Sequence, residues 1–308
     1  MKLSRRGFMQ SGMAAAALPF MAGAQAQPAA GAAATTPATQ KPMVCIFSKH
    51  LQFLNYTEMA AALKEMGADG TDLTVRPKGH VLPENVERDL PAAVAAVRAV
   101  GLEVPMISVR VNDAKEPDAE RIAKVAAQEG IPYVRLSDYR YELALPIPPQ
   151  VEAFTAQLRG MGEVLDRHGL TGGYHNHSGT AQFGGPIWDL HQALTTIHAA
   201  NLGSNFDVGH AMVEGTLGAA EVNTHLIAPH VKMSAVKDFV WEGAKPKWVP
   251  LGEGIVPIAK MYGILRKAGF SGPISIHFEY EPASNDALLK DMAAAVKVLR
   301  GALSEAGY

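Results

Sequence analysis

Short apolar runs rich in β-branched residues alternate with longer segments of helical period from residue 43 to the C-terminus. Such runs are typical of buried strands, and the segments between them are typical of helices that cover a parallel sheet. Repeated strand–helix units without a break predict one (β/α)8 barrel over residues 43–308. The predicted strands are 43–48, 71–76, 104–110, 133–137, 172–177, 204–208, 232–237 and 273–280.

Helical periodicity and glycine positions support the same organisation. Several predicted helices are followed by a glycine suited to a C-cap: Gly67, Gly101, Gly130, Gly169 and Gly269. The clearest predicted helices are 56–66, 84–100, 119–129, 149–168 and a last one over 285–303. The segment after the first strand, Ser48 to Leu51, lacks the glycine-rich turn of an open dinucleotide-binding sheet. We therefore favour a closed barrel.

The N-terminal residues resemble an export signal followed by a linker. Arg5 and Arg6 precede Phe8, and the apolar stretch 12–22 ends near a small-residue cleavage pattern, Ala24 to Ala26. This predicts a cleaved twin-arginine signal peptide at 1–26, export by the twin-arginine machinery and a periplasmic location. The apolar stretch is too short for a stable membrane anchor. Residues 27–42 are rich in Ala, Pro and Thr, which predicts a disordered linker. A basic amphipathic helix is the alternative.

Composition narrows the classes of partner. Hydrophobic residues make up 48% of the chain and charged residues 19%, which is ordinary globular usage. The net charge of -2 offers no basic field for a nucleic-acid backbone, so no nucleic-acid partner is expected. Cys45 is the single cysteine, which excludes an internal disulfide and a cysteine-based zinc site. It lies in an apolar run and is expected in the core.

Polar residues gather where the predicted strands end. In a (β/α)8 barrel the active site is built at these C-terminal strand ends, so the side chains should converge. Histidine and carboxylate groups together are the ingredients of a divalent metal site, and they suit Mn, Zn, Fe or Co better than Ca. In strand order, the polar residues are Arg76 and His80, Arg110, Arg135 and Asp138, His175 and His177, Asp207 and His210, Lys237 and Asp238, and finally His277, Glu279 and Glu281.

Several of these residues are candidates for binding a substrate, each with a structural alternative. Arg76, His80 and Arg110 could contact it or form structural pairs. Lys237 could stabilise a developing oxyanion, or it could form an ion pair with Asp238 at the strand end. Two further candidates follow the seventh strand: Trp241, which could wall a pocket or pack on the rim, and Glu253 of a Gly-Glu-Gly turn, which could be merely solvated.

Five motifs in order resemble the xylose isomerase-like sugar isomerase/epimerase superfamily over residues 43–303. The motifs are Tyr174-His-Asn-His177, Asn205-Phe-Asp-Val-Gly-His210, Val236-Lys-Asp-Phe239, Leu251-Gly-Glu-Gly254 and Ile276-His-Phe-Glu279. The resemblance implies a barrel with a divalent cation such as Mn, Zn, Co or Mg. It implies Asp207 and Glu279 as metal ligands and His210 as a substrate contact.

The chain departs from the superfamily at two ligand positions. At the fifth strand the superfamily usually supplies a glutamate, and this chain has His175 instead. Inosose dehydratases carry a similar Tyr-His-x-His run, so the resemblance implies His175 as a third metal ligand. Ala235 stands where the seventh strand usually supplies a histidine. His177 or His210 could fill that gap. A non-catalytic periplasmic sugar-binding barrel that has lost its metal is therefore a rival interpretation.

The function implied is proton abstraction beside the carbonyl of a keto sugar, with Glu279 as the base and His177 and Lys237 as acid or oxyanion partners. Reprotonation of the enediolate gives an isomerase or epimerase. Loss of a β-substituent would instead give a dehydratase or lyase acting on a keto sugar, an inosose or a 3-keto-glycoside. Because the chain is expected in the periplasm, the carbohydrate substrate is expected to be unphosphorylated.

Overall fold

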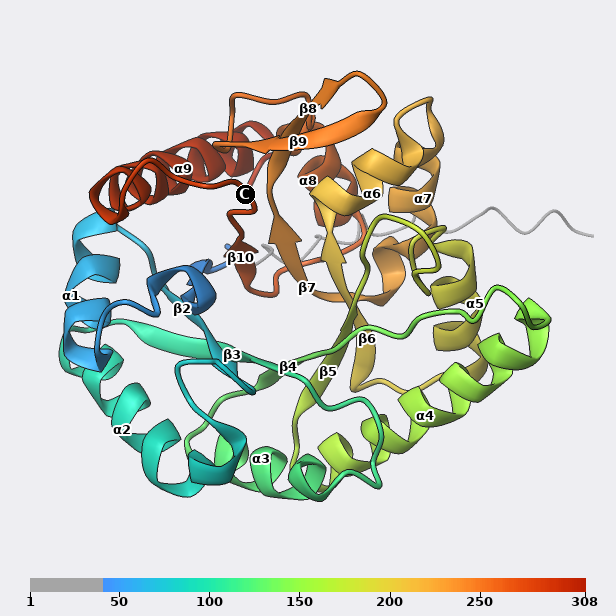
Figure 1. Cartoon of the computed structure of the whole chain (residues 1–308), viewed down its shortest axis with the longest axis horizontal. Helices are drawn as coiled ribbons and strands as arrows, with labels where there is room; N and C mark the ends of the chain where they lie inside the picture. The colour runs from blue at the N-terminus through green and yellow to red at the C-terminus, as the bar shows by residue number, and fades with distance from the viewer. Residues whose placement is uncertain (1–40) are drawn as a thin grey trace, which may run out of the picture. The chain divides into compact units, whose positions relative to one another are not determined.

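Eight parallel strands close into a barrel, with helices arranged around the outside (Figure 1). The structure is a computed structural model that describes residues 41–308, so the predicted signal peptide and all but two residues of the predicted linker lie outside it. The barrel order is β1-β10-β7-β6-β5-β4-β3-β2, which confirms the (β/α)8 prediction. The barrel strands are β1 (Val44–Phe47), β2 (Gly70–Val75), β3 (Glu103–Val109), β4 (Tyr133–Leu136), β5 (Thr171–His175), β6 (Leu202–Asp207), β7 (Val231–Val236) and β10 (Ile274–Ile276).

The helices form the outer ring and bury one apolar face each against the barrel. All five predicted helices are present within two residues at each end, and the five predicted cap glycines all have positive φ. In the last helix, Leu288, Met292 and Leu299 are among the buried residues of the predicted stripe. The helices are α1 (Tyr56–Met66), α2 (Val86–Ala99), α3 (Pro117–Gln128), α4 (Ile147–Arg167), α5 (Trp188–Ile197), α6 (Val208–Gly215), α7 (Ala219–Ile227), α8 (Ile258–Lys267) and α9 (Asn285–Glu305), with short 3-10 turns at Ser48–Leu51, Pro83–Asn85 and Ala228–His230.

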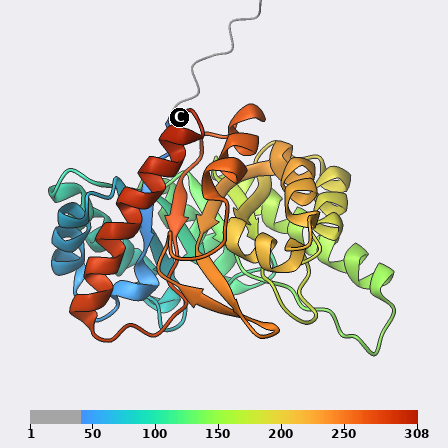
Figure 2. The same cartoon turned by 90° about the horizontal axis from the view of Figure 1, so that it is seen from above.

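A two-stranded hairpin was not predicted. β8 (Asp238–Glu242) and β9 (Lys245–Val249) pair antiparallel directly after β7 and project from the strand ends of the barrel (Figures 1 and 2). Trp241, predicted only to follow the seventh strand, lies in β8, and Trp248 lies in β9. The second strand of the hairpin contains Lys245, Pro246 and Lys247, which hide the strand pattern.

The barrel interior is polar below the strand ends. Asp72 is fully buried and accepts hydrogen bonds from Ser108 Oγ at 2.8 Å and Ser275 Oγ at 2.9 Å. Cys45 is buried as expected.

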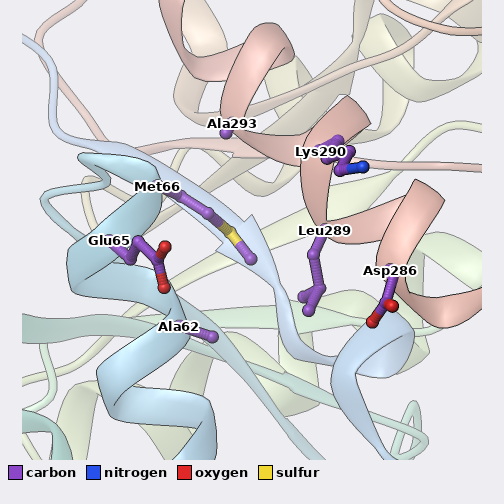
Figure 3. A pocket seen from close by; sticks show the side chains of 7 residues that line it. All are labelled: Ala62, Glu65, Met66, Asp286, Leu289, Lys290 and Ala293. Carbon is purple, nitrogen blue, oxygen red and sulfur yellow. The ribbon is translucent and has the colours of Figure 1, made fainter.

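A surface hollow of about 310 Å³ lies between α1 and α9 on the outer ring, beside Met66 and Leu289 (Figure 3). Within residues 41–308 no helix is both long and apolar enough to cross a membrane.

Candidate active site

A polar cavity of about 190 Å³ lies at the C-terminal ends of the barrel strands. This is the volume of roughly six water molecules at about 30 Å³ each, so it suits a small polar ligand. Polar groups dominate its wall, and Phe47 is the one aromatic hydrocarbon ring among the lining residues. The lining comprises Phe47, Lys49, Arg76, Arg110, Arg135, Ser137, Asp138, His175, His177, His277 and Glu279.

Three buried side chains at the base of this site have the geometry of a metal site. One nitrogen each of His175 and His277 and one oxygen of Asp207 lie within 4.8 Å of one another. Two buried atoms of the group, Asp207 Oδ2 and His277 Nε2, have no hydrogen-bond partner. Asp207 Oδ2 still forms an ion pair with Lys237 Nζ at 3.2 Å, whereas His277 Nε2 has only Asp72 Oδ2 at 3.9 Å, beyond hydrogen-bond distance. Because buried polar atoms are normally paired, the unpaired His277 nitrogen indicates a place for a cation. Two imidazoles and one carboxylate fit a divalent transition metal with open coordination positions.

Neighbouring residues hold two of these ligands in place. Asn176 fixes the backbone of Asp207, accepting its N–H at 2.7 Å and donating to its carbonyl at 3.1 Å. Asn205 Nδ2 lies 3.3 Å from His175 Nδ1, and Asn205 Oδ1 has no partner. Turning the amide by 180° would let Oδ1 accept the Nδ1–H of His175. That arrangement leaves the His175 Nε2 lone pair free for a metal.

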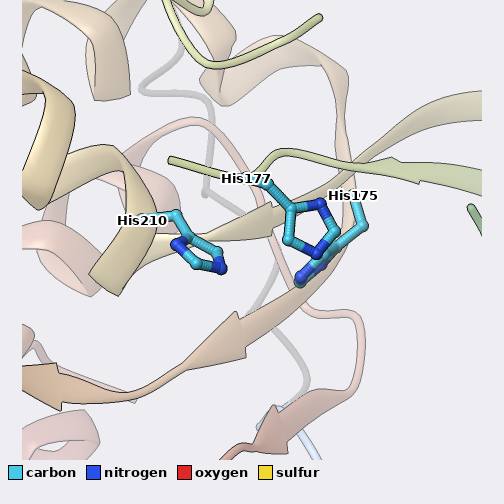
Figure 4. Close-up of side chains that lie close together, drawn as sticks. All are labelled: His175, His177 and His210. Carbon is cyan, nitrogen blue, oxygen red and sulfur yellow. The ribbon is translucent and has the colours of Figure 1, made fainter. Parts of the chain in front are cut away.

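A second histidine group shares His175 with the first. Ring nitrogens of His175, His177 and His210 also lie within 4.8 Å of one another, and Figure 4 shows their rings turned toward one another. Both nitrogens of His210 are engaged, since Nε2 lies 2.7 Å from Lys237 Nζ and Nδ1 lies 2.8 Å from Ser178 Oγ. His210 is therefore less available as a ligand than His277.

Lys237 connects the metal group, meaning His175, Asp207 and His277, to the mouth of the cavity. Its buried ammonium lies 2.5 Å from Glu279 Oε1 and 3.2 Å from Asp207 Oδ2. Burial raises the Glu279 pKa, but the charge and hydrogen bond of Lys237, together with the contribution of His210, outweigh it and the net pKa lies below the usual value. Glu279 is therefore ionised at neutral pH and its side chain, 33% exposed, lines the cavity.

The histidines of the site are neutral at physiological pH. Burial lowers the His177 pKa to about 4, with a further contribution from the charge of Arg135. Burial likewise lowers the pKa values of His175, His210 and His277 well below the usual range. Neutral imidazoles can accept a proton or bind a metal without first losing one.

Asp238 does not pair with Lys237, so the predicted ion-pair alternative is wrong. Its carboxylate accepts four backbone N–H bonds, from Phe239 and Val256 to Oδ1 and from Gly252 and Gly254 to Oδ2. A Cβ at Gly254 would collide with Asp238 Oδ1 and the Phe239 carbonyl, which explains the glycine. Asp238 therefore fixes the segment after the hairpin.

The structure brings together most of the predicted site residues. His175, His177, Asp207, His210, Lys237 and Glu279 form one cluster, and Arg76 and Arg110 line the cavity above it. Three predicted substrate contacts lie outside both this cluster and the cavity lining. His80 lines a separate surface depression with Tyr56, Trp241 is exposed on the hairpin, and Glu253 is exposed in its turn.

The structure places His277, rather than Glu279, in the close group with His175 and Asp207. Strand alternation indicates which residues share a face but not how deep each lies. The N–H of His277 still bonds to the Val236 carbonyl, so His277 lies in the strand ladder and Glu279 lies above it. Trp248, rather than Trp241, reaches the site: its ring lies 4.8 Å from Lys237 Nζ and 5.2 Å from the His210 ring.

The chain belongs to the xylose isomerase-like TIM barrel family, whose profile matches residues 55–301. No curated protein matches the chain. A xylose isomerase-like TIM barrel protein from Mycobacterium smegmatis, solved in complex with magnesium, has 15% identity and a TM-score of 0.64, covering 85% of this chain and 97% of that one. The 3-keto-D-glucoside 4-epimerase of E. coli has 14% identity and a TM-score of 0.65, with coverages of 83% and 99%.

A third similar structure is the probable 3-DHS dehydratase AsbF from Bacillus anthracis. It has 15% identity and a TM-score of 0.66, covering 84% of this chain and 98% of that one. At such identities the likeness concerns the fold, and the reaction must be argued from the site.

Proposed function

We propose that the protein is a divalent-metal-dependent isomerase or epimerase that removes a proton beside the carbonyl of a keto sugar. One observation carries the proposal. The buried group His175, Asp207 and His277, in which His277 Nε2 has no hydrogen-bond partner, lies next to an ionised carboxylate that faces the same small polar cavity. A metal ion at the group would polarise the substrate carbonyl and so acidify the neighbouring C–H.

Glu279 is the proposed base. It is ionised, it lines the cavity, and Lys237 holds its Oε1 in place. When Glu279 takes a proton from carbon, its charge is lost and the Lys237 ammonium can stabilise the oxyanion that develops on the substrate. His177, neutral and with an unpartnered buried Nδ1, is placed to exchange a proton with a substrate oxygen.

The outcome for the enediolate depends on the substrate. Return of the proton to the other face or the other carbon gives epimerisation or isomerisation, whereas a leaving group on the next carbon gives a dehydratase or lyase. The similar folds include both an epimerase of a 3-keto-glucoside and a probable dehydratase, which supports this range.

Solvent exchange tests the proposal before the natural substrate is identified. The chain without residues 1–26 is loaded with Mn²⁺, Co²⁺, Zn²⁺ or Mg²⁺ and incubated in D₂O with keto hexoses and 3-keto-glucosides, and NMR follows loss of the C–H signal beside the carbonyl. Glu279→Gln should slow the exchange by at least about 100-fold. Glu281→Gln is the matched control, because Glu281 is exposed and does not line the cavity.

Two results would contradict the proposal. Exchange at the normal rate in Glu279→Gln would remove this residue from the mechanism. Tight sugar binding with no bound metal and no exchange would indicate the rival function, a non-catalytic sugar-binding barrel, which Ala235 on β7 motivates.

We also propose that the protein acts in the periplasm after twin-arginine export. Arg5, Arg6 and the small-residue pattern ending at Ala26 support this location. Fractionation of cells that produce the full chain should place a shortened protein in the periplasm. A double substitution, Arg5→Lys with Arg6→Lys, should retain it in the cytoplasm at full length, and periplasmic protein from that variant would contradict the proposal.

A further inference from the structure

Four cationic side chains occupy one half of the cavity mouth. Lys49 follows β1, Arg76 follows β2, Arg110 follows β3 and Arg135 lies in β4, and these four strands are consecutive neighbours in the barrel. The metal group and Glu279 come from the other half, β5, β6 and the segment after β10. The site is thus divided into a cationic half and a half that holds the metal group and the base.

Most of these cations have no direct carboxylate partner in the protein. Arg110 shares Asp138 with Arg140, each at 3.8 Å. Within residues 41–308, the side chains of Lys49, Arg76 and Arg135 form neither an ion pair within 4.0 Å nor a hydrogen bond to a protein group. The buried carboxylate of Asp72, whose charge acts most strongly on Arg135, already accepts hydrogen bonds from two serines.

Arg135 is the most informative of the four residues. Its side chain is buried, and its Nε has no hydrogen-bond partner. A buried guanidinium without a directly paired carboxylate is costly, because its charge has lost hydration and the surrounding carboxylates act on it only from beyond 4.0 Å. Burial lowers the pKa of Arg135 and of Arg76, and the charge of Arg135 lowers the Arg76 pKa further.

Phe47 holds the two guanidinium groups beside the reaction site. Arg76 Cζ lies 5.4 Å and Arg135 Cζ 5.7 Å from the centre of the Phe47 ring, within cation–π range. The same ring stacks on His277 with centroids 4.3 Å apart. The unpaired donors are therefore positioned one aromatic ring away from a proposed metal ligand.

We propose that Arg76 and Arg135, assisted by Lys49 and Arg110, bind an anionic group of the substrate, so that the enzyme acts on an acidic sugar rather than a neutral one. Guanidinium groups recognise carboxylate and phosphate oxygens through paired, charge-assisted hydrogen bonds. The anion would satisfy the donors that the protein leaves unpaired. The assignment of the substrate class rests on the proposed function, but the anion site itself depends only on the cationic half.

Calorimetric binding to the chain without residues 1–26 tests the inference without requiring turnover. The probes are D-glucuronate for a carboxylate, a glucose phosphate ester for a phosphate, inorganic phosphate alone, and D-glucose as the neutral sugar. At least one anionic sugar should bind about tenfold or more tightly than glucose, since charge-assisted hydrogen bonds to guanidinium groups are stronger than neutral ones. The preference should weaken in high salt.

Substitutions then assign the preference to residues. Arg76→Gln and Arg135→Gln should each weaken binding of the preferred anion by about tenfold or more and change glucose binding little. Arg76 is only partly buried, so its substitution remains informative if Arg135→Gln fails to fold. Arg88→Gln is the control, because this arginine on α2 is 74% exposed and pairs only with its neighbour Asp89.

Each outcome has a distinct meaning. The ratio between the carboxylate and phosphate probes identifies the source of the negative charge. Glucose binding as tightly as both anionic sugars, or an anion preference unchanged by Arg76→Gln, would overturn the inference. Anion binding without proton exchange would support the anion site and contradict the proposed reaction. Exchange confined to neutral keto sugars would support the reaction and contradict the inference of an acidic substrate.

Discussion

Replacing Asp238 with asparagine should destabilise the protein strongly, although Asp238 does not line the cavity. The carboxylate accepts four backbone N–H bonds between 2.9 and 3.1 Å, two at each oxygen. Asparagine keeps one acceptor oxygen and puts an NH₂ group where the other oxygen accepted two N–H groups. Two hydrogen bonds to a charged acceptor are lost, at about 1.5 kcal/mol or more each, so the expected loss is about 3 kcal/mol.

Differential scanning calorimetry measures this effect. For a domain of this size, about 1 kcal/mol corresponds to roughly 2–4 °C, so the Tm should fall by about 6–12 °C. Asp166→Asn is the matched control, because Asp166 is exposed near the end of α4 and should leave the Tm within about 1 °C. A fall of less than about 3 °C in Asp238→Asn would refute the assignment of these four bonds as the main support of the segment.

Three further predictions follow from the same geometry. Gly254→Ala should lower the Tm because its Cβ would collide with Asp238, whereas Gly263→Ala in α8, where the Cβ meets nothing within 4 Å, should raise stability by about 0.5–1 kcal/mol; equal effects in calorimetry would contradict this. Burial lowers the His50 pKa to about 3, and His50 Nε2 accepts the Phe278 N–H. In the unfolded chain the His50 imidazole takes up a proton near pH 6.5, whereas in the native chain it stays neutral until about pH 3. Stability measured by urea unfolding should therefore fall as the pH drops from about 6.5 toward 3, and less so in His50→Gln than in the exposed control His198→Gln; parallel pH profiles would refute this. Trp248→Ala should lower kcat/KM roughly tenfold through its contacts with Lys237 and His210, while Trp241→Ala should have little effect, and the reverse order would contradict the placement of the hairpin.

The strands and helices of the barrel were predictable because each buries a periodic apolar face. The β8–β9 hairpin was not predictable from periodicity, because its second strand contains two lysines and a proline and is held by pairing with β8. Convergence of the polar strand ends was likewise predictable from the topology of the fold.

Depth within the barrel and the balance of charge were not predictable. Alternation places His277 and Glu279 on one face, but only the three-dimensional register shows that His277 joins His175 and Asp207 while Glu279 meets Lys237. Arg135 could be located at a strand end, yet its lack of a partner depends on distances between four different strands.

The metal affinity of four variants tests the account most directly. Competition with a chelating dye measures Mn²⁺, Co²⁺ or Zn²⁺ binding to His175→Ala, Asp207→Asn, His277→Ala and Glu279→Gln. Losing a direct ligand should weaken binding by more than the roughly 10–100-fold typical of supporting residues, so the first three variants should lose affinity to that degree. Glu279→Gln should bind metal nearly as well as the unaltered protein. Strong loss in Glu279→Gln with normal affinity in His277→Ala would contradict the ligand set and the role of Glu279 as the base.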